Sequence, residues 1–169
     1  MIYEPAEDSF LIKNHIKHYA RGKILDLGTG SGILAEEALR YSKDVLASDI
    51  NQKALDNLKI NTIKSDLFEN IKTKFDLIIF NPPYLPEDGR EPEEVALATS
   101  GGKNGYEILE KFFMQVRHRL NKNGKILVVF SSLTNKSKVD QIIRCNNFRF
   151  KLLEKKKIPF EELYCYLVY

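Results

Sequence analysis

An almost entirely apolar run at residues 75–80 ends abruptly in Asn81-Pro82-Pro83-Tyr84. Such a run predicts a strand that is buried on both faces, as in the centre of a parallel sheet. Two consecutive prolines remove two backbone donors and fix two φ angles, so the strand must end there in a stiff turn. We therefore expect Asn81 at the carboxyl edge of an open α/β sheet, where such sheets bind their ligands.

The same four residues are candidates for catalysis as well as for structure. The side-chain oxygen of Asn81 and the backbone carbonyl of Pro82 are two acceptors that can receive both hydrogens of a planar NH2 group, while Tyr84 packs on its plane. The alternative interpretation is a structural proline turn capped by asparagine, because short motifs also occur without function.

A glycine-rich turn follows a predicted strand at residues 23–28 and opens a predicted helix. Strand, glycine turn and helix together begin a nucleotide-binding α/β unit, in which glycines let the backbone approach a ligand. A dinucleotide fingerprint requires its third glycine at position 33, where this chain has Ile33. The pattern Asp26-x-Gly28-x-Gly30-x-Gly32 fits S-adenosylmethionine better, because that cofactor has no pyrophosphate.

Two acidic residues follow at the ends of the next predicted strands, which cover residues 44–50 and 62–67. Asp49 lies 21 residues after Gly28, near the offset at which an acid accepts hydrogen bonds from ribose hydroxyls. Asp66 is a candidate for the adenine amino group. A lone acid at a strand end is otherwise a helix cap or a turn residue, and Asn51 is already predicted to cap the helix after Asp49.

Residues 81–105 show no strand or helix pattern and are rich in glycine, proline and acidic residues. Loops longer than about 12–15 residues are uncommon in compact domains and are usually lids, binding loops or disordered segments. We interpret this segment as an acidic lid over the site. The alternative is a disordered surface loop.

The remaining elements complete an alternation of helices and strands. Residues 1–22 hold an N-terminal segment and a helix that begins near Ser9. The helix after the glycine turn should face inward at Leu34, Ala38 and Tyr41. A later helix has an apolar face from Leu109 to Leu120 and should end at Asn123-Gly124, and a strand at 125–130 follows it. Ser137 and Asp140 should open the next helix, and antiparallel strands at 148–153 and 163–169 should be joined by a tip that contains Lys155, Lys156 and Lys157.

Size and composition indicate one ordinary globular domain spanning residues 1–169. Hydrophobic residues make up 43% and charged residues 29%, and the net charge of +3 is too weak to demand nucleic acid as a partner. Cys145 and Cys165 have no metal-like spacing, so we expect two reduced, buried thiols and no metal. No signal peptide or membrane-spanning run is evident, which predicts a cytoplasmic protein.

The order of elements, with its final hairpin, resembles the seven-stranded class I methyltransferase fold, which is Rossmann-like and mostly parallel. The residues 26–32 and the Asn-Pro-Pro-Tyr motif resemble the HemK group of protein-glutamine methyltransferases. Glu91-Pro92, Ala96-Leu97 and Gly101-Gly102-Lys103-Asn104-Gly105 look like the segment that follows that motif in the family. The opening residues 3–10 resemble the eukaryotic and archaeal branch, which lacks the N-terminal helical domain of the bacterial enzymes.

The resemblance implies transfer of a methyl group from S-adenosylmethionine to the glutamine of a Gly-Gly-Gln motif in the class-1 translation termination (peptide chain release) factor. It also implies a small zinc-binding activator subunit, and any zinc would sit in that partner. The cofactor contacts implied by the resemblance are Ser9, Asp26, Gly28, Gly30, Asp49, Asp66, Leu67 and Asn81. Ser9 replaces the threonine that is common in the family and keeps its hydroxyl.

Three alternative functions remain to be weighed. A nucleic-acid methyltransferase acting on an exocyclic amine such as N6 of adenine would use the same motif, because its target is also a planar NH2 group on a flipped base. The weak net charge and the acidic lid disfavour it. A noncatalytic cofactor-binding scaffold subunit is disfavoured by the intact Asn81, and a dehydrogenase is disfavoured by Ile33.

Overall fold

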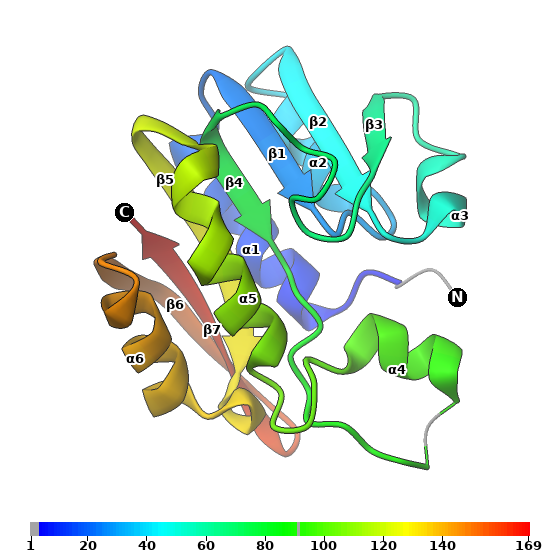
Figure 1. The fold of residues 1–169 in the computed structure, drawn as a ribbon, viewed down its shortest axis with the longest axis vertical. Helices are drawn as coiled ribbons and strands as arrows, with labels where there is room; N and C mark the ends of the chain where they lie inside the picture. The colour runs from blue at the N-terminus through cyan, green and yellow to red at the C-terminus, as the bar shows by residue number, and fades with distance from the viewer. Residues whose placement is uncertain (1–3, 91) are drawn as a thin grey trace.

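The computed structural model describes residues 4–90 and 92–169, and its centre is a seven-stranded sheet with the strand order β3-β2-β1-β4-β5-β7-β6 (Figure 1). The strands β1 to β5 pair in parallel, and β7 pairs antiparallel with both β5 and β6. The predicted mostly parallel α/β sheet with an antiparallel hairpin is confirmed. The strands are β1 (Lys23–Leu27), β2 (Asp44–Asp49), β3 (Asn61–Lys64), β4 (Phe75–Phe80), β5 (Leu120–Ser131), β6 (Phe150–Ile158) and β7 (Glu161–Val168).

Helices cover both faces of the sheet (Figure 1). In the view of Figure 1, α5 and α6 lie in front of the sheet and pack on each other, while α1 and α2 lie behind it and also pack on each other. The helices are α1 (Glu7–Tyr19), α2 (Ile33–Leu39), α3 (Gln52–Leu55), α4 (Glu93–Thr99), α5 (Glu107–Val116) and α6 (Lys136–Cys145), with 3-10 turns at Arg117–Arg119 and Ser132–Thr134.

The strand β4 is the centre of the core, as its apolar run predicts. Five of its six residues are buried, and only Asp76 is partly exposed. The ring of Phe80 at the end of β4 packs 4.6 Å from that of Phe112 on α5, and Phe112 stacks on Phe68 at 5.6 Å. This aromatic packing fixes the last residue of β4, and with it the position from which Asn81 starts.

The helix α5 is shorter than its apolar period suggests. It ends at Val116, and Leu120 begins β5, so the prediction that the helix continues through Leu120 to an Asn123-Gly124 stop is wrong. Leu120 pairs with Phe75 and Lys125 with Leu77, which leaves an irregularity in β5 between the two pairs. Asn123 has a φ of 64° within this irregularity. It accommodates a bend in a strand, and does not end a helix.

Other expected boundaries also differ from the structure. The helix α6 was expected to begin with Ser137 and Asp140. Its cap is instead the side chain of Asn135, which accepts a hydrogen bond from the amide of Lys138. The three lysines at 155–157 lie within β6, paired with residues 162–164, and do not form the hairpin tip. Cys165 is buried as expected, but Cys145 at the end of α6 is exposed. Tyr41 lies beyond the end of α2 and is exposed as well.

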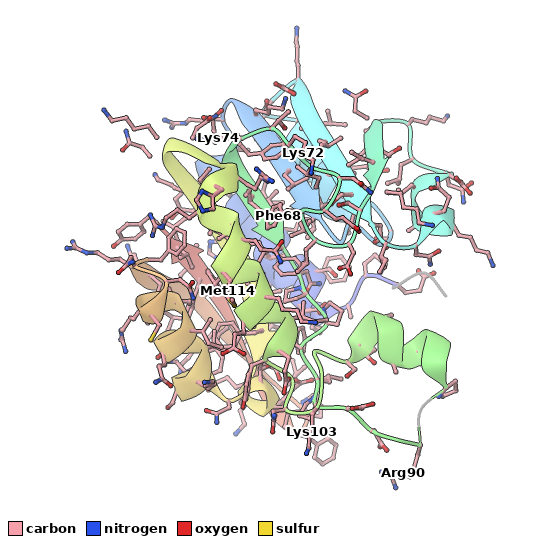
Figure 2. The ribbon with its side chains drawn as sticks, viewed as in Figure 1. Phe68, Lys72, Lys74, Arg90, Lys103 and Met114 are labelled. Atoms are coloured by element: carbon pink, nitrogen blue, oxygen red, sulfur yellow. The ribbon has the colours of Figure 1, made fainter. Side chains whose placement is uncertain are left out.

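The segment 81–105 is not free of regular structure, contrary to the prediction. It contains α4, which Pro92 precedes, as suits a residue whose fixed φ favours a helix start. The amide of Leu85 donates to Thr99 O at 2.9 Å, and the amide of Gly101 donates to Leu85 O at 2.9 Å. These bonds tie the end of α4 back to Leu85, which follows the proline turn, so residues 85–90 and 92–101 form an arm anchored beside Tyr84. Figure 2 shows Arg90 at the outer tip of this arm.

Candidate active site

A cavity of about 990 Å³ opens at the carboxyl edge of the sheet, where β1, β2 and β4 end. This volume is within the range of small-molecule sites. The glycine turn, the ends of β2 and β3, the proline turn, the end of α4 and one side of α5 all contribute to its wall. The lining includes Ser9, Gly28, Gly30, Asp49, Asp66, Leu67, Asn81, Pro82 and Tyr84, so the structure brings together the candidate residues from five segments, and Asp26 alone among them lies outside the lining.

The glycine turn presents backbone to the cavity. Gly28 has a φ of 69° and is exposed, and a Cβ there would meet no atom closer than Phe80 at 3.8 Å. Gly32 has a φ of 85°, and a Cβ at that position would overlap the side chain of Leu58. The positive φ therefore favours glycine at both positions, and a Cβ at Gly32 would in addition displace the end of the Leu58 side chain.

Asp26 lies beneath the glycine turn, fully buried. Its Oδ2 accepts hydrogen bonds from Thr29 Oγ1 at 2.6 Å and from the amide of Ala35 at 3.0 Å. Its Oδ1 is buried and has no hydrogen-bond partner among the described residues. The pKa of Asp26 is raised to about 7, chiefly by burial and to a smaller extent by the nearby charge of Asp49, whereas the two hydrogen bonds lower it. Asp26 thus holds the turn to the start of α2.

Asp49 faces the cavity from the end of β2. Its Oδ2 accepts from the amide of Gly30 at 2.9 Å, and its Oδ1 accepts from the amide of Asn51 at 2.8 Å. Asn51 in turn caps α3 by accepting from the amide of Lys53. Asp49 is therefore not the cap of that helix. Each of its oxygens can accept a second hydrogen bond from a ligand such as a ribose diol.

The third candidate acid sits in a turn beyond β3. The strand ends at Lys64, so the expectation that it ends at Asp66 is wrong. Asp66 is exposed, and Leu67 has a φ of 43°, which is uncommon for a branched side chain. The hydroxyl of Ser65 donates to Leu67 O at 2.9 Å and stabilises this conformation. Both Asp66 and Leu67 line the cavity.

Asn81 stands at the junction of the cavity and the first turn of α1. Its Nδ2 donates to Ser9 Oγ at 3.4 Å, which brings together residues 72 positions apart. Its Oδ1 is buried and has no hydrogen-bond partner among the described residues. A buried amide oxygen without a partner is costly in a folded protein, and it commonly marks a site where a ligand supplies the missing donor.

Tyr84 is held at both ends. Its hydroxyl donates to Asp8 Oδ2 at 2.9 Å, and its backbone oxygen accepts from Thr134 Oγ1 at 2.9 Å. The ring is buried but contributes to the cavity wall. The aromatic plane next to Asn81 is therefore fixed by contacts to α1 and to the 3-10 turn after β5.

Sequence reasoning missed the residues that support the proline turn. In the sequence, Asp8 has only the pattern of an acid in the first turn of a helix, and Thr134 carries no signal. Gly101 and Gly105 also approach the turn, since added Cβ atoms would lie 2.9 Å from Pro83 O and 2.6 Å from Tyr84 O. The two glycines four residues apart in a long segment were the available signal for such close backbone packing.

Within residues 4–90 and 92–169, no group of three or more metal-ligating side chains is close enough to hold a metal ion. None of the helices described is both long and apolar enough to cross a membrane.

Comparison with known proteins identifies the family. Residues 7–154 match the model of the methyltransferase small domain. The chain belongs to this family. A protein of Methanocaldococcus jannaschii that is named for protein N5-glutamine methyltransferase activity is 36% identical over 96% of this chain and 88% of its own length. This places the chain in the HemK-type protein-glutamine methyltransferase group.

Two further matches agree. The release factor glutamine methyltransferase of Borreliella burgdorferi is 35% identical over 72% of this chain, which spans about half (49%) of that relative. The solved structure of the E. cuniculi Mtq2-Trm112 complex, described as responsible for methylation of the eRF1 translation termination factor, matches with a TM-score of 0.80 and 26% identity. That match covers 99% of this chain and 97% of the other.

The class I methyltransferase fold and its cofactor, S-adenosylmethionine, follow from this membership, and the residues present fit that group. The glycine turn leaves its backbone open to the cavity at Gly28, and the Asp49 carboxylate keeps acceptor capacity for hydroxyls. The side chain of Ile33 stands at the position where a pyrophosphate site needs glycine, and no phosphate is required here. Asn81, whose Oδ1 has no hydrogen-bond partner among the described residues, lines the same cavity and follows Phe80, which pairs with Leu27 just before the glycine turn.

Proposed function

We propose that this chain transfers a methyl group from S-adenosylmethionine to the side-chain amide nitrogen of the glutamine in the Gly-Gly-Gln motif of a translation termination factor. The observation that carries the proposal is the buried Oδ1 of Asn81, which has no hydrogen-bond partner in the described part of the chain and lies beside a cavity of cofactor size. A primary amide supplies two hydrogens on a planar nitrogen, which is the donor that this oxygen lacks.

The chemistry requires a weak nucleophile to be oriented. When bound, S-adenosylmethionine supplies an electrophilic methyl group. The lone pair of an amide nitrogen is delocalised, so the nitrogen attacks poorly unless its environment favours the reacting electron distribution. Asn81 Oδ1 and Pro82 O each accept one amide hydrogen and fix the nitrogen in the line of attack, while Tyr84 bounds the amide plane. Positioning and preorganised electrostatics supply the rate enhancement.

The proton balance needs no general base. The amide nitrogen gains a methyl group and becomes acidic, and one of its protons then leaves to solvent.

The roles of the remaining site residues are part of the proposal. Ser9, Gly28, Gly30, Asp49, Asp66, Leu67 and Asn81 contact the cofactor directly, which their place in the cavity lining supports. Asp26 acts through the glycine turn that it holds. One methyltransferase domain spans residues 1–169, and the segment 81–105 serves as the lid, supported by Ala98 and Thr99 in the cavity wall.

The names of the relatives support the choice of substrate and partner. The Borreliella relative is named for release factor glutamine, and the E. cuniculi protein was solved with Trm112 and described as methylating eRF1. We extend to this chain a termination factor as substrate and a small activator subunit that binds zinc. The reaction then takes place in the cytoplasm, where translation terminates.

The experiment is transfer of labelled methyl from S-adenosylmethionine to purified termination factor, with and without a candidate zinc-binding partner. The control substrate is the same factor with the glutamine of its Gly-Gly-Gln motif replaced by alanine. Total RNA and DNA are assayed beside them. Label in the wild-type factor alone supports the proposal. Label in nucleic acid alone would establish the exocyclic-amine alternative, and cofactor binding without transfer to any substrate would establish the scaffold alternative.

A further inference from the structure

Asp8 is a buried carboxylate outside the set of residues that contact the cofactor or the substrate amide in the proposed function. It is 3% exposed, and it belongs to the first turn of α1, not to the sheet edge. A buried carboxylate is expensive unless its oxygens are well used, so its contacts indicate why it is there.

Both oxygens of Asp8 connect to the catalytic turn (residues 81–84), Oδ2 directly and Oδ1 through Ser9. Oδ2 accepts from the hydroxyl of Tyr84 at 2.9 Å. Oδ1 accepts from the amide of Ser9 at 2.6 Å and from Ser9 Oγ at 3.3 Å. Ser9 Oγ then accepts from Asn81 Nδ2 at 3.4 Å. The Asp8 carboxylate is therefore linked to the Tyr84 ring through Oδ2 and to the Asn81 amide through Oδ1 and Ser9.

The direction of the hydrogen bonds matters. Because the hydroxyl of Ser9 donates to Asp8, a lone pair of Ser9 Oγ faces Asn81, and it can only accept. The Asn81 side chain must then point its NH2 group at Ser9, which leaves Oδ1 without a hydrogen-bond partner among residues 4–90 and 92–169. Hydrogen bonds in such a chain polarise one another, so a negative charge at its start strengthens Asn81 Oδ1 as an acceptor.

We infer that Asp8 is the positioning residue of the catalytic turn, fixing through Ser9 and Tyr84 the orientation of the Asn81 amide that receives the substrate. The inference rests on the proposed function, in which Asn81 Oδ1 accepts a hydrogen from the substrate amide. It adds a role for the first turn of α1, which sequence reasoning treated as a helix start with a cofactor hydroxyl.

The test is Asp8→Asn, which keeps the shape of the side chain and removes its charge. The matched control is Asp140→Asn, because Asp140 Oδ1 also accepts from a tyrosine hydroxyl, that of Tyr166 at 2.8 Å, outside the cavity lining. For each variant we would measure the melting temperature, the dissociation constant of S-adenosylmethionine and the single-turnover rate at saturating cofactor.

The inference predicts that Asp8→Asn lowers the saturated rate by about tenfold to a hundredfold with nearly unchanged cofactor affinity, as a small misplacement of a reacting group does. Asp140→Asn should lower the melting temperature and leave the rate unchanged. A rate in Asp8→Asn equal to that of Asp140→Asn would overturn the inference. If Asp8→Asn does not fold, Ser9→Ala removes the hydroxyl that links Asp8 to Asn81, and Tyr84→Phe removes the hydroxyl that binds Asp8 Oδ2. Unchanged rates in both of these variants would also overturn the inference.

A second measurement separates this inference from the proposed function. The side-chain NH2 signals of Asn81 in a ¹⁵N-correlated NMR spectrum, assigned by their loss in Asn81→Ala, report the amide orientation without any substrate. The inference predicts that Asp8→Asn shifts these signals and that Asp140→Asn does not. Unshifted signals overturn the role of Asp8 whatever the substrate is. A wild-type protein that labels no glutamine overturns the proposed substrate even if the signals shift.

Discussion

Replacing Asp26 by asparagine should change how the stability of the protein depends on pH. Burial raises the pKa of this carboxyl to about 7 from its usual 3.8, so the folded protein keeps a proton that the unfolded chain releases at lower pH. The stability that this proton contributes is fully present below about pH 4. It is lost as the pH rises through about 7.

The size of the effect follows from the two pKa values. The interval between 3.8 and about 7 corresponds to at most about 4 kcal/mol of unfolding free energy. Between pH 5 and pH 8 the loss from this group should be about 2–3 kcal/mol. The side chain of Asp26 is fully buried, so solvent does not screen this contribution.

Asparagine at this position cannot ionise, but its oxygen can still accept from Thr29 Oγ1 and from the amide of Ala35. Urea unfolding of both proteins at pH 5, 6, 7 and 8 measures the difference in unfolding free energy. We expect the advantage of the wild type over Asp26→Asn to shrink steadily as the pH rises. A difference that is the same at pH 5 and pH 8 would refute the raised pKa.

Further predictions concern the cavity wall and the proline turn. Asp49→Ala should weaken cofactor binding about tenfold to a hundredfold without unfolding the protein, because charge-assisted hydrogen bonds worth about 1.5–3 kcal/mol are lost, and unchanged affinity in a calorimetric titration would remove Asp49 from the site. Gly105→Ala should lower both the melting temperature and the saturated transfer rate, since its φ is 88° and a Cβ would lie 2.6 Å from Tyr84 O. Gly89→Ala in the same segment meets nothing within 4 Å, so equal effects of the two alanines would contradict this explanation.

Local patterns predicted the parts of the site that are local. The apolar run before two prolines placed Asn81 at a strand end, and the glycine spacing with Asp49 indicated the cofactor side of the cavity. The contact of Asp8 with Tyr84 joins residues 76 positions apart, and no pattern in one sequence specifies such a partner. Leu120 fits the period of the preceding helix by chance, and tertiary pairing with Phe75 assigns it to a strand.

The structure of the segment 81–105 also depends on contacts that local sequence patterns do not specify. The helix α4 has seven residues, which is too short to establish a convincing apolar period. Its order comes from hydrogen bonds that Leu85 makes with Thr99 and Gly101, and these pairings are visible only in three dimensions.

The most direct test of the central claim is single-turnover methyl transfer by Asn81→Ala at saturating S-adenosylmethionine, measured beside a binding titration of the cofactor. Removing one preorganised acceptor at the reacting centre typically lowers the rate by about 10²–10³. We expect a loss of that size with most cofactor affinity retained, because the glycine turn, Asp49 and Asp66 remain in place. Transfer at the wild-type rate would show that the proline turn is structural and that Asn81 does not act on the substrate amide.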